Sequence, residues 1–121
     1  VMHTGSGTDD VGTRELIIRG SHFEVGLHYK GKKSARRPNV DVGEVGRFEM
    51  TGTTIINHPG AADALHIRAH SIDAIILDSN NEVKGDCEFE GYGKFKDPNG
   101  DGSGYQAMLL AIANDPKVTI L

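Results

Sequence analysis

The chain has little of several residue types that define common classes of protein. Among its 121 residues there is one cysteine, Cys87, so an intrachain disulfide and a zinc site made of several cysteines are both excluded. There is no tryptophan, and aromatic residues make up only 6%, so a core would consist mainly of aliphatic side chains. A single cysteine fits a reducing compartment, and we therefore expect a cytoplasmic protein.

Long apolar runs and a signal peptide are also missing. No stretch approaches the ~20 apolar residues that span a bilayer, and the first residues lack the basic start and apolar run of a signal peptide. This pattern predicts no membrane partner. The net charge of −4 disfavours binding to duplex nucleic acid, because affinity for phosphates depends on an excess of basic groups.

Glycine is abundant instead, and it separates short stretches in which apolar and polar residues alternate. The 16 glycines have no regular period, which predicts frequent turns rather than long helices. A period of two is typical of half-buried strands. It is found over residues 22–29, 65–77 and 83–96, and residues 14–19, 46–57 and 117–121 are further strand candidates. The run over 83–96 is the cleanest and predicts one long strand, whereas a change of parity near Ile72 predicts a bend.

About seven such strands, with no internal repeat and no alternation of strands with helices, predict an all-β fold. We expect mainly antiparallel strands in a small barrel or sandwich. Residues 105–113 are ambiguous, because their Ala, Leu, Met and Gln favour a helix while their apolar run between strand signals favours a buried strand. We expect a strand there, with a short helix as the alternative. Residues 1–13 are expected to form a flexible N-terminal arm before a single domain over 14–121.

Polar residues on alternating segments form the first candidate site. His66, Arg68 and His70 would share one face of a strand, with Arg68 attracting a carboxylate or phosphate and the histidines orienting it. On a straight strand His66 and His70 would lie about 13 Å apart, too far to hold one metal ion between them. Glu24 and His28, which share a face of an earlier strand, complete the expected ligand-binding set.

A second candidate is the polar loop over 97–104. Its alternate positions carry oxygen-bearing side chains, those of Asp97, Asn99, Asp101 and Ser103. With glycine at the sixth position, this spacing resembles the first half of a helix-loop-helix calcium loop. The twelfth position is Met108, so the closing glutamate is missing. A plain turn built from Asp-Pro, Asn-Gly and Asp-Gly pairs explains the same residues.

These features predict a non-enzymatic binding domain for a small polar or anionic ligand. The alternatives are a calcium-stabilised surface-recognition module and a small enzyme that uses histidine and glutamate as acid and base. A further candidate for contact with phosphate or an acidic partner is the basic loop of Lys30, Lys32, Lys33, Arg36 and Arg37, although such loops are typically solvated. Sheet edges make a homo-oligomer a further expectation. Cys87 is expected to be an inert core residue.

Overall fold

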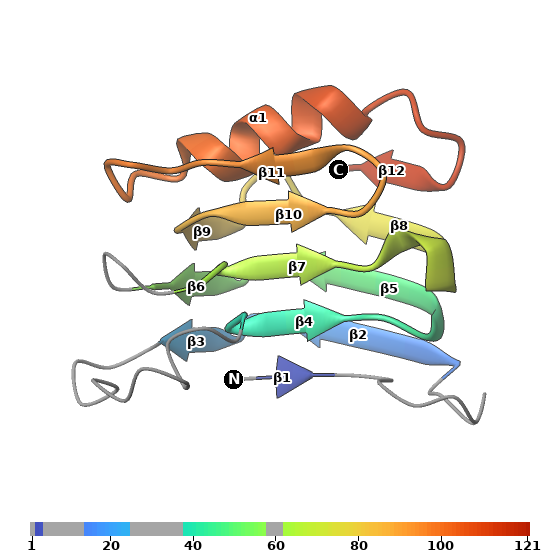
Figure 1. The fold of residues 1–121 in the computed structure, drawn as a ribbon. Helices are drawn as coiled ribbons and strands as arrows, with labels where there is room; N and C mark the ends of the chain where they lie inside the picture. The colour runs from blue at the N-terminus through green and yellow to red at the C-terminus, as the bar shows by residue number, and fades with distance from the viewer. Residues whose placement is uncertain (1, 4–13, 25–37, 58–61) are drawn as a thin grey trace.

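The strands of the protein form three sheets in a computed structural model, which describes residues 2–3, 14–24, 38–57 and 62–121 (Figure 1). Sheet A contains, in spatial order, β1 (Met2–His3), β4 (Val40–Val42), β7 (Leu65–Ile67), β10 (Cys87–Phe89) and β11 (Gly93–Phe95). Sheet B contains β2 (Glu15–Arg19), β5 (Val45–Thr51), β8 (Ile72–Leu77) and β12 (Val118–Ile120). Sheet C contains β3 (His22–Glu24), β6 (Thr54–Ile56) and β9 (Glu82–Lys84).

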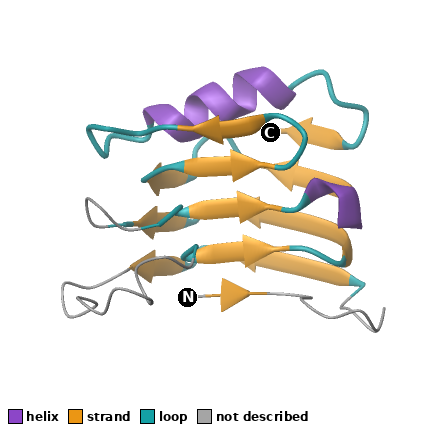
Figure 2. Ribbon diagram, viewed as in Figure 1, coloured by secondary structure: helices purple, strands orange, loops and turns teal. Residues whose placement is uncertain are grey.

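The chain winds through the three sheets as a coil. β4, β5 and β6 follow one another along the chain and belong to sheets A, B and C, and β7, β8 and β9 repeat the same order one turn later (Figures 1 and 2). Val40 pairs with Leu65, which pairs with Cys87, so one turn takes about 22 to 25 residues. β10 and β11 are antiparallel, and every other pair of described strands is parallel. The architecture is therefore that of a parallel β-helix.

The expected antiparallel barrel or sandwich is wrong, because the sheets of the described residues are mainly parallel and none closes into a barrel. The reason is that a period of two shows which side chains share a face, but not which strand lies alongside or in which direction it runs. Each turn repeats the pattern of burial without repeating the residues themselves. The sequence therefore shows no internal repeat, although the structure has one.

The long strand expected over 83–96 is also wrong, because the chain turns corners within it and forms β9, β10 and β11. Gly85 separates the first two with a φ of 137°, a conformation that residues with a side chain rarely adopt. A Cβ at Gly85 would also lie 2.9 Å from the Cβ of Ala64. Gly52, with a φ of 54°, makes the corner between β5 and β6. The alternation of apolar and polar residues continues across the corner at Gly85, because buried and more exposed side chains keep alternating from β9 into β10.

Rows of buried aliphatic side chains fill the coil. Val40, Leu65 and Cys87 share one register position on sheet A and are fully buried, as are Phe48 and Ile75 on sheet B. Such burial of apolar area is the main favourable contribution to folding. The core position expected for Cys87 is confirmed, and burial raises the pKa of its thiol far above the ordinary range, which makes it a poor nucleophile.

One end of the coil is covered by α1 (Ser103–Ile112), so the strand preferred for residues 105–113 is wrong and the helical alternative describes them. Tyr105, Met108 and Ile112 lie on its buried face, and the helix packs against β9, β10 and β11. The Tyr105 hydroxyl donates to the backbone oxygen of Asp78 at 2.8 Å and accepts from Asn81 Nδ2 at 3.0 Å. None of the described helices is both long and apolar enough to cross a lipid bilayer.

We expect Phe48→Ala to lower the free energy of unfolding by about 3–5 kcal/mol, because it removes a fully buried ring from the coil. Leu110→Ala is the control, since Leu110 is 82% exposed on α1 and should cost less than about 0.5 kcal/mol. Urea unfolding at neutral pH measures both values. Equal losses in the two variants would contradict the core proposed for sheet B.

Candidate functional site

One row across the outer face of sheet A consists of charged or titratable side chains. Asp41 on β4 lies opposite His66 on β7, His66 opposite Glu88 on β10, and Glu88 opposite Lys94 on β11. The neighbours of these residues along β4, β7 and β10 are buried, so the row itself points outward. In-register pairing therefore brings together side chains that are far apart in the sequence.

Arg68 follows β7 and is held by Asp41. Its Nε lies 2.9 Å from Asp41 Oδ1 and its Nη2 lies 3.0 Å from Oδ2, which is a bidentate ion pair. The stem of Arg68 lies over Gly43, where an added Cβ would be 3.0 Å from Arg68 Cδ. Hydrogen bonding to Asp41 raises the pKa of Arg68. Asp41 thus occupies the Nε–Nη2 edge of the guanidinium and neutralises much of its charge, which disfavours Arg68 as the principal binding group for an anion.

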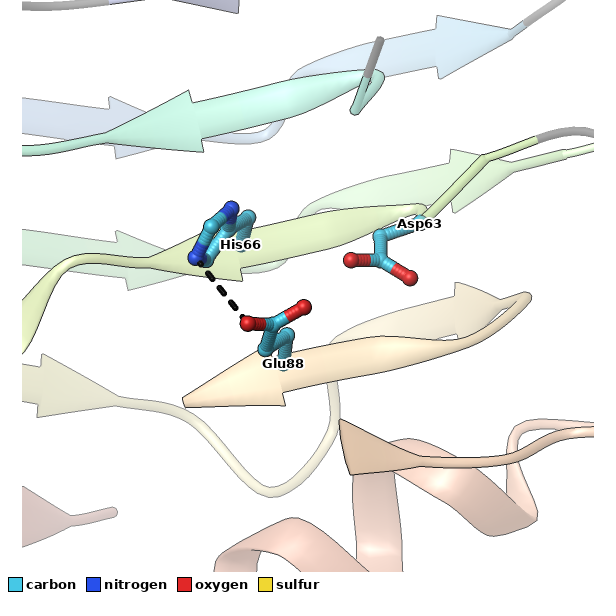
Figure 3. A group of neighbouring side chains, drawn as sticks. All are labelled: Asp63, His66 and Glu88. Carbon is cyan, nitrogen blue, oxygen red and sulfur yellow. Dashed lines mark ion pairs between the residues drawn. The ribbon is translucent and has the colours of Figure 1, made fainter. Parts of the chain in front are cut away.

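Asp63, His66 and Glu88 form a cluster of three potential metal ligands (Figure 3). Their ligand atoms all lie within 4.8 Å of one another, and His66 Nε2 is 3.6 Å from Glu88 Oε2. His66 Nδ1 lies 4.0 Å from Asp41 Oδ1. Asp63 comes just before β7 and Glu88 lies on β10, so the cluster joins two successive turns of the coil. Imidazole nitrogen and carboxylate oxygen are common ligands of divalent transition metals.

Asp63 is the most buried member of the cluster, with 8% of its side chain exposed. Within the described part of the chain, its Oδ1 accepts no hydrogen bond. Lys94 Nζ lies 3.0 Å from this oxygen, so the two groups form an ion pair. Asp63 in turn raises the pKa of Lys94. A buried carboxylate costs free energy unless hydrogen bonds or a cation compensate its charge, and at Asp63 Oδ1 the ammonium group of Lys94 supplies that compensation.

The structure brings together only part of the ligand-binding set expected from the sequence. His66 lies in the cluster, and Arg68 lies beside it on Asp41. His70 lies in the 3-10 helix η2 (Ala69–Ser71), which makes the bend expected near Ile72. It is exposed, and its Nδ1 lies 2.8 Å from Glu90 Oε1. The three residues do not share one strand face, because the strand ends at Ile67 and the chain turns toward sheet B.

The other expected residues lie elsewhere. Glu24 is on β3 of sheet C, where its Oε1 is 3.0 Å from His22 Nε2, and it is therefore not part of the row on sheet A. His28 lies outside the described residues, as do the five basic side chains over 30–37.

Three residues of this site were not predicted from the sequence: Asp41, Asp63 and Glu88. The signal that could have found Asp41 and Glu88 is their spacing of about one turn from His66, at the same register position. That spacing becomes meaningful only when the parallel coil is known.

Asp97, the first expected calcium ligand, accepts four hydrogen bonds at the start of α1. Its Oδ2 accepts from the backbone nitrogens of Gly85 at 2.8 Å and Gly102 at 3.1 Å. Its Oδ1 accepts from Ser103 Oγ at 3.0 Å and from the Asp101 backbone nitrogen at 3.2 Å. Burial alone would raise the pKa of Asp97, but these hydrogen bonds outweigh burial and lower the pKa to about 2.

This arrangement favours the turn interpretation of the loop over a calcium site. Both oxygens of Asp97 already face N–H and O–H donors, and Asp101 Oδ1 accepts from the Ser103 backbone nitrogen at 3.1 Å. Asn99 is exposed. The carboxylate of Asp97 instead joins the corner at Gly85 to the first turn of the helix.

We expect Asp97→Asn to lower the free energy of unfolding at pH 7 by about 2 kcal/mol, since each unit of pKa difference corresponds to ~1.4 kcal/mol. The pKa of Asp97 is lower in the folded protein than its ordinary value of 3.8. Its contribution is therefore fully present above about pH 4 and is lost as the pH falls toward 2. Urea unfolding at pH 7, 4 and 2.5 should show a weaker pH dependence in this variant than in the exposed control Asp73→Asn. Identical pH dependences would contradict the assignment.

Comparisons of the chain with protein-family models, curated proteins and solved structures gave no match. The functional interpretation therefore depends on the geometry of the outer face of sheet A.

Proposed function

We propose that the chain is a binding module whose outer face of sheet A holds a divalent metal ion between Asp63, His66 and Glu88. The observation that supports this proposal is the separation of at most 4.8 Å among their ligand atoms. One imidazole and two carboxylates suit zinc and similar transition metals better than calcium or magnesium, which prefer oxygen ligands. Three protein ligands leave a fourth position for water or for a ligand.

The distances require only a small closure of the side chains. In a tetrahedral zinc site with bonds of about 2.1 Å, the ligand atoms are about 3.4 Å apart. His66 Nε2 and Glu88 Oε2 are already 3.6 Å apart. Glu88 is the most exposed of the three ligands, with 38% of its side chain accessible. Its carboxylate can therefore rotate toward the other two ligands without moving buried neighbours.

The charge of this face also favours a cation. Its acidic side chains are those of Asp41, Asp63, Asp86, Glu88 and Glu90. They outnumber the basic side chains of Arg68, Lys94 and Lys96, and such an excess raises the local concentration of cations. The small polar or anionic ligand expected from the sequence fits this face best as a group that occupies the open position on the metal.

Acid–base catalysis is less well supported by the same residues. His66 Nε2 and Glu88 Oε2 are 3.6 Å apart, which exceeds the ~2.6–3.2 Å of a hydrogen bond between an acid and a base. The closer pairs, His70 with Glu90 and His22 with Glu24, are exposed at the surface, with 76% and 58% of the histidine side chains accessible.

We expect zinc to bind the wild-type protein in the micromolar range and to raise its melting temperature, because the ion would join two turns of the coil. His66→Ala should weaken binding by roughly tenfold or more, since it removes the only nitrogen ligand of the proposed set. Isothermal titration calorimetry at pH 7.5 measures the affinity. The matched control is His70→Ala, which also removes a histidine beside a carboxylate on this side of the molecule and should change the affinity by less than about twofold. Equal effects of the two substitutions would contradict the site.

A further inference from the structure

The ammonium group of Lys94 lies beside Asp63, the most buried ligand of the proposed metal site. Lys94 is on β11, opposite Glu88, and its side chain extends to Asp63, with Nζ 3.0 Å from Asp63 Oδ1. We propose that Lys94 is a tethered cation that exchanges with the metal ion and thereby sets the affinity and selectivity of the site. This inference rests on the metal site proposed above and adds a residue that opposes binding.

The exchange follows from the burial of the two partners. Asp63 has 8% of its side chain exposed and is held in place just before β7, whereas 43% of the Lys94 side chain is exposed. A lysine has a flexible four-carbon stem and a strongly hydrated charge, so it can move into solvent at little cost. A metal bound to Asp63 would lie within a few ångströms of the ammonium group, where the two positive charges repel.

The same contact makes the site selective. In the absence of a metal ion, Lys94 compensates the buried charge of Asp63, so the cluster is not left with an unpaired carboxylate. A monovalent ion that replaced the ammonium group would bring no additional charge. A divalent transition metal brings a second charge and also binds the His66 nitrogen, which an ammonium group cannot do. Lys94 therefore excludes weak cations and admits those that bind all three ligands.

Lys96 is a natural control for this proposal. It lies two positions further along the chain, and its Nζ is 3.5 Å from Asp86 Oδ2, with 70% of its side chain exposed. Replacing Lys96 changes the net charge of this face by the same amount as replacing Lys94. It leaves the contact with Asp63 intact, so it separates a general effect of charge from the exchange at the site.

The experiment measures zinc affinity by competition with a chromophoric chelator in the wild type, Lys94→Met, Lys96→Met and Lys94→Arg. We expect Lys94→Met to bind zinc about tenfold or more tightly than the wild type. Lys96→Met should change the affinity by less than about threefold. Lys94→Arg keeps the charge and should bind zinc no more tightly than the wild type. Circular dichroism of each variant establishes that the fold is unchanged.

The outcomes distinguish this inference from the metal site on which it rests. If zinc binds the wild type and Lys94→Met shows no gain over Lys96→Met, the exchange is overturned while the metal site stands. If the tighter binding of Lys94→Met is lost on adding His66→Ala, the exchange occurs at the proposed cluster. Zinc binding that does not depend on His66, or no binding by any variant, overturns both proposals. Binding that is measurable only after Lys94→Met supports the exchange.

Discussion

Parallel pairing between successive turns is the constraint on which both the core and the candidate site depend. Each strand of one turn pairs in register with the equivalent strand of the next, as Val40 does with Leu65 and Leu65 with Cys87. Side chains at one register position therefore form a row, directed either inward or outward. A slip of one residue would turn the buried rows outward and the polar row inward. The same hydrogen bonds that build the core thus place His66 beside Asp41 and Glu88.

The corners between the sheets keep this register through the backbone conformation and the hydrogen bonds of particular residues. Gly85 adopts a φ that other residues avoid, and its backbone nitrogen donates to Asp97. Asp97 also accepts hydrogen bonds from Gly102 and Ser103, where α1 begins. A single buried carboxylate therefore joins the last corner of sheet C to the helix that covers the end of the coil. The loop resembling a calcium site is explained by this structural function, in which the carboxylate compensates N–H groups rather than a metal ion.

Compensation of charge also organises the outer face of sheet A. Arg68 binds Asp41 through two contacts, and Lys94 lies against Asp63. Basic side chains therefore form ion pairs with the least exposed carboxylates of this face. The two ion pairs differ in how easily they can open. Arg68 is bidentate and lies over Gly43, whereas Lys94 makes one ion pair at the end of a flexible stem. This difference supports a site that can exchange its cation near Asp63 and a rigid pair near Asp41.

By itself, the sequence determined where many side chains face and where several strands lie, including those over 14–19 and 117–121. It also determined the bend near Ile72. A period of two encodes the direction of the side chains, because alternate residues of a strand lie on opposite faces. Only the tertiary structure decided the direction and partners of the strands, the corners within 83–96 and the helix over 103–112. It also decided the cluster of Asp63, His66 and Glu88. These features depend on contacts between residues about one turn apart, and a local pattern contains no information about which distant segment lies alongside.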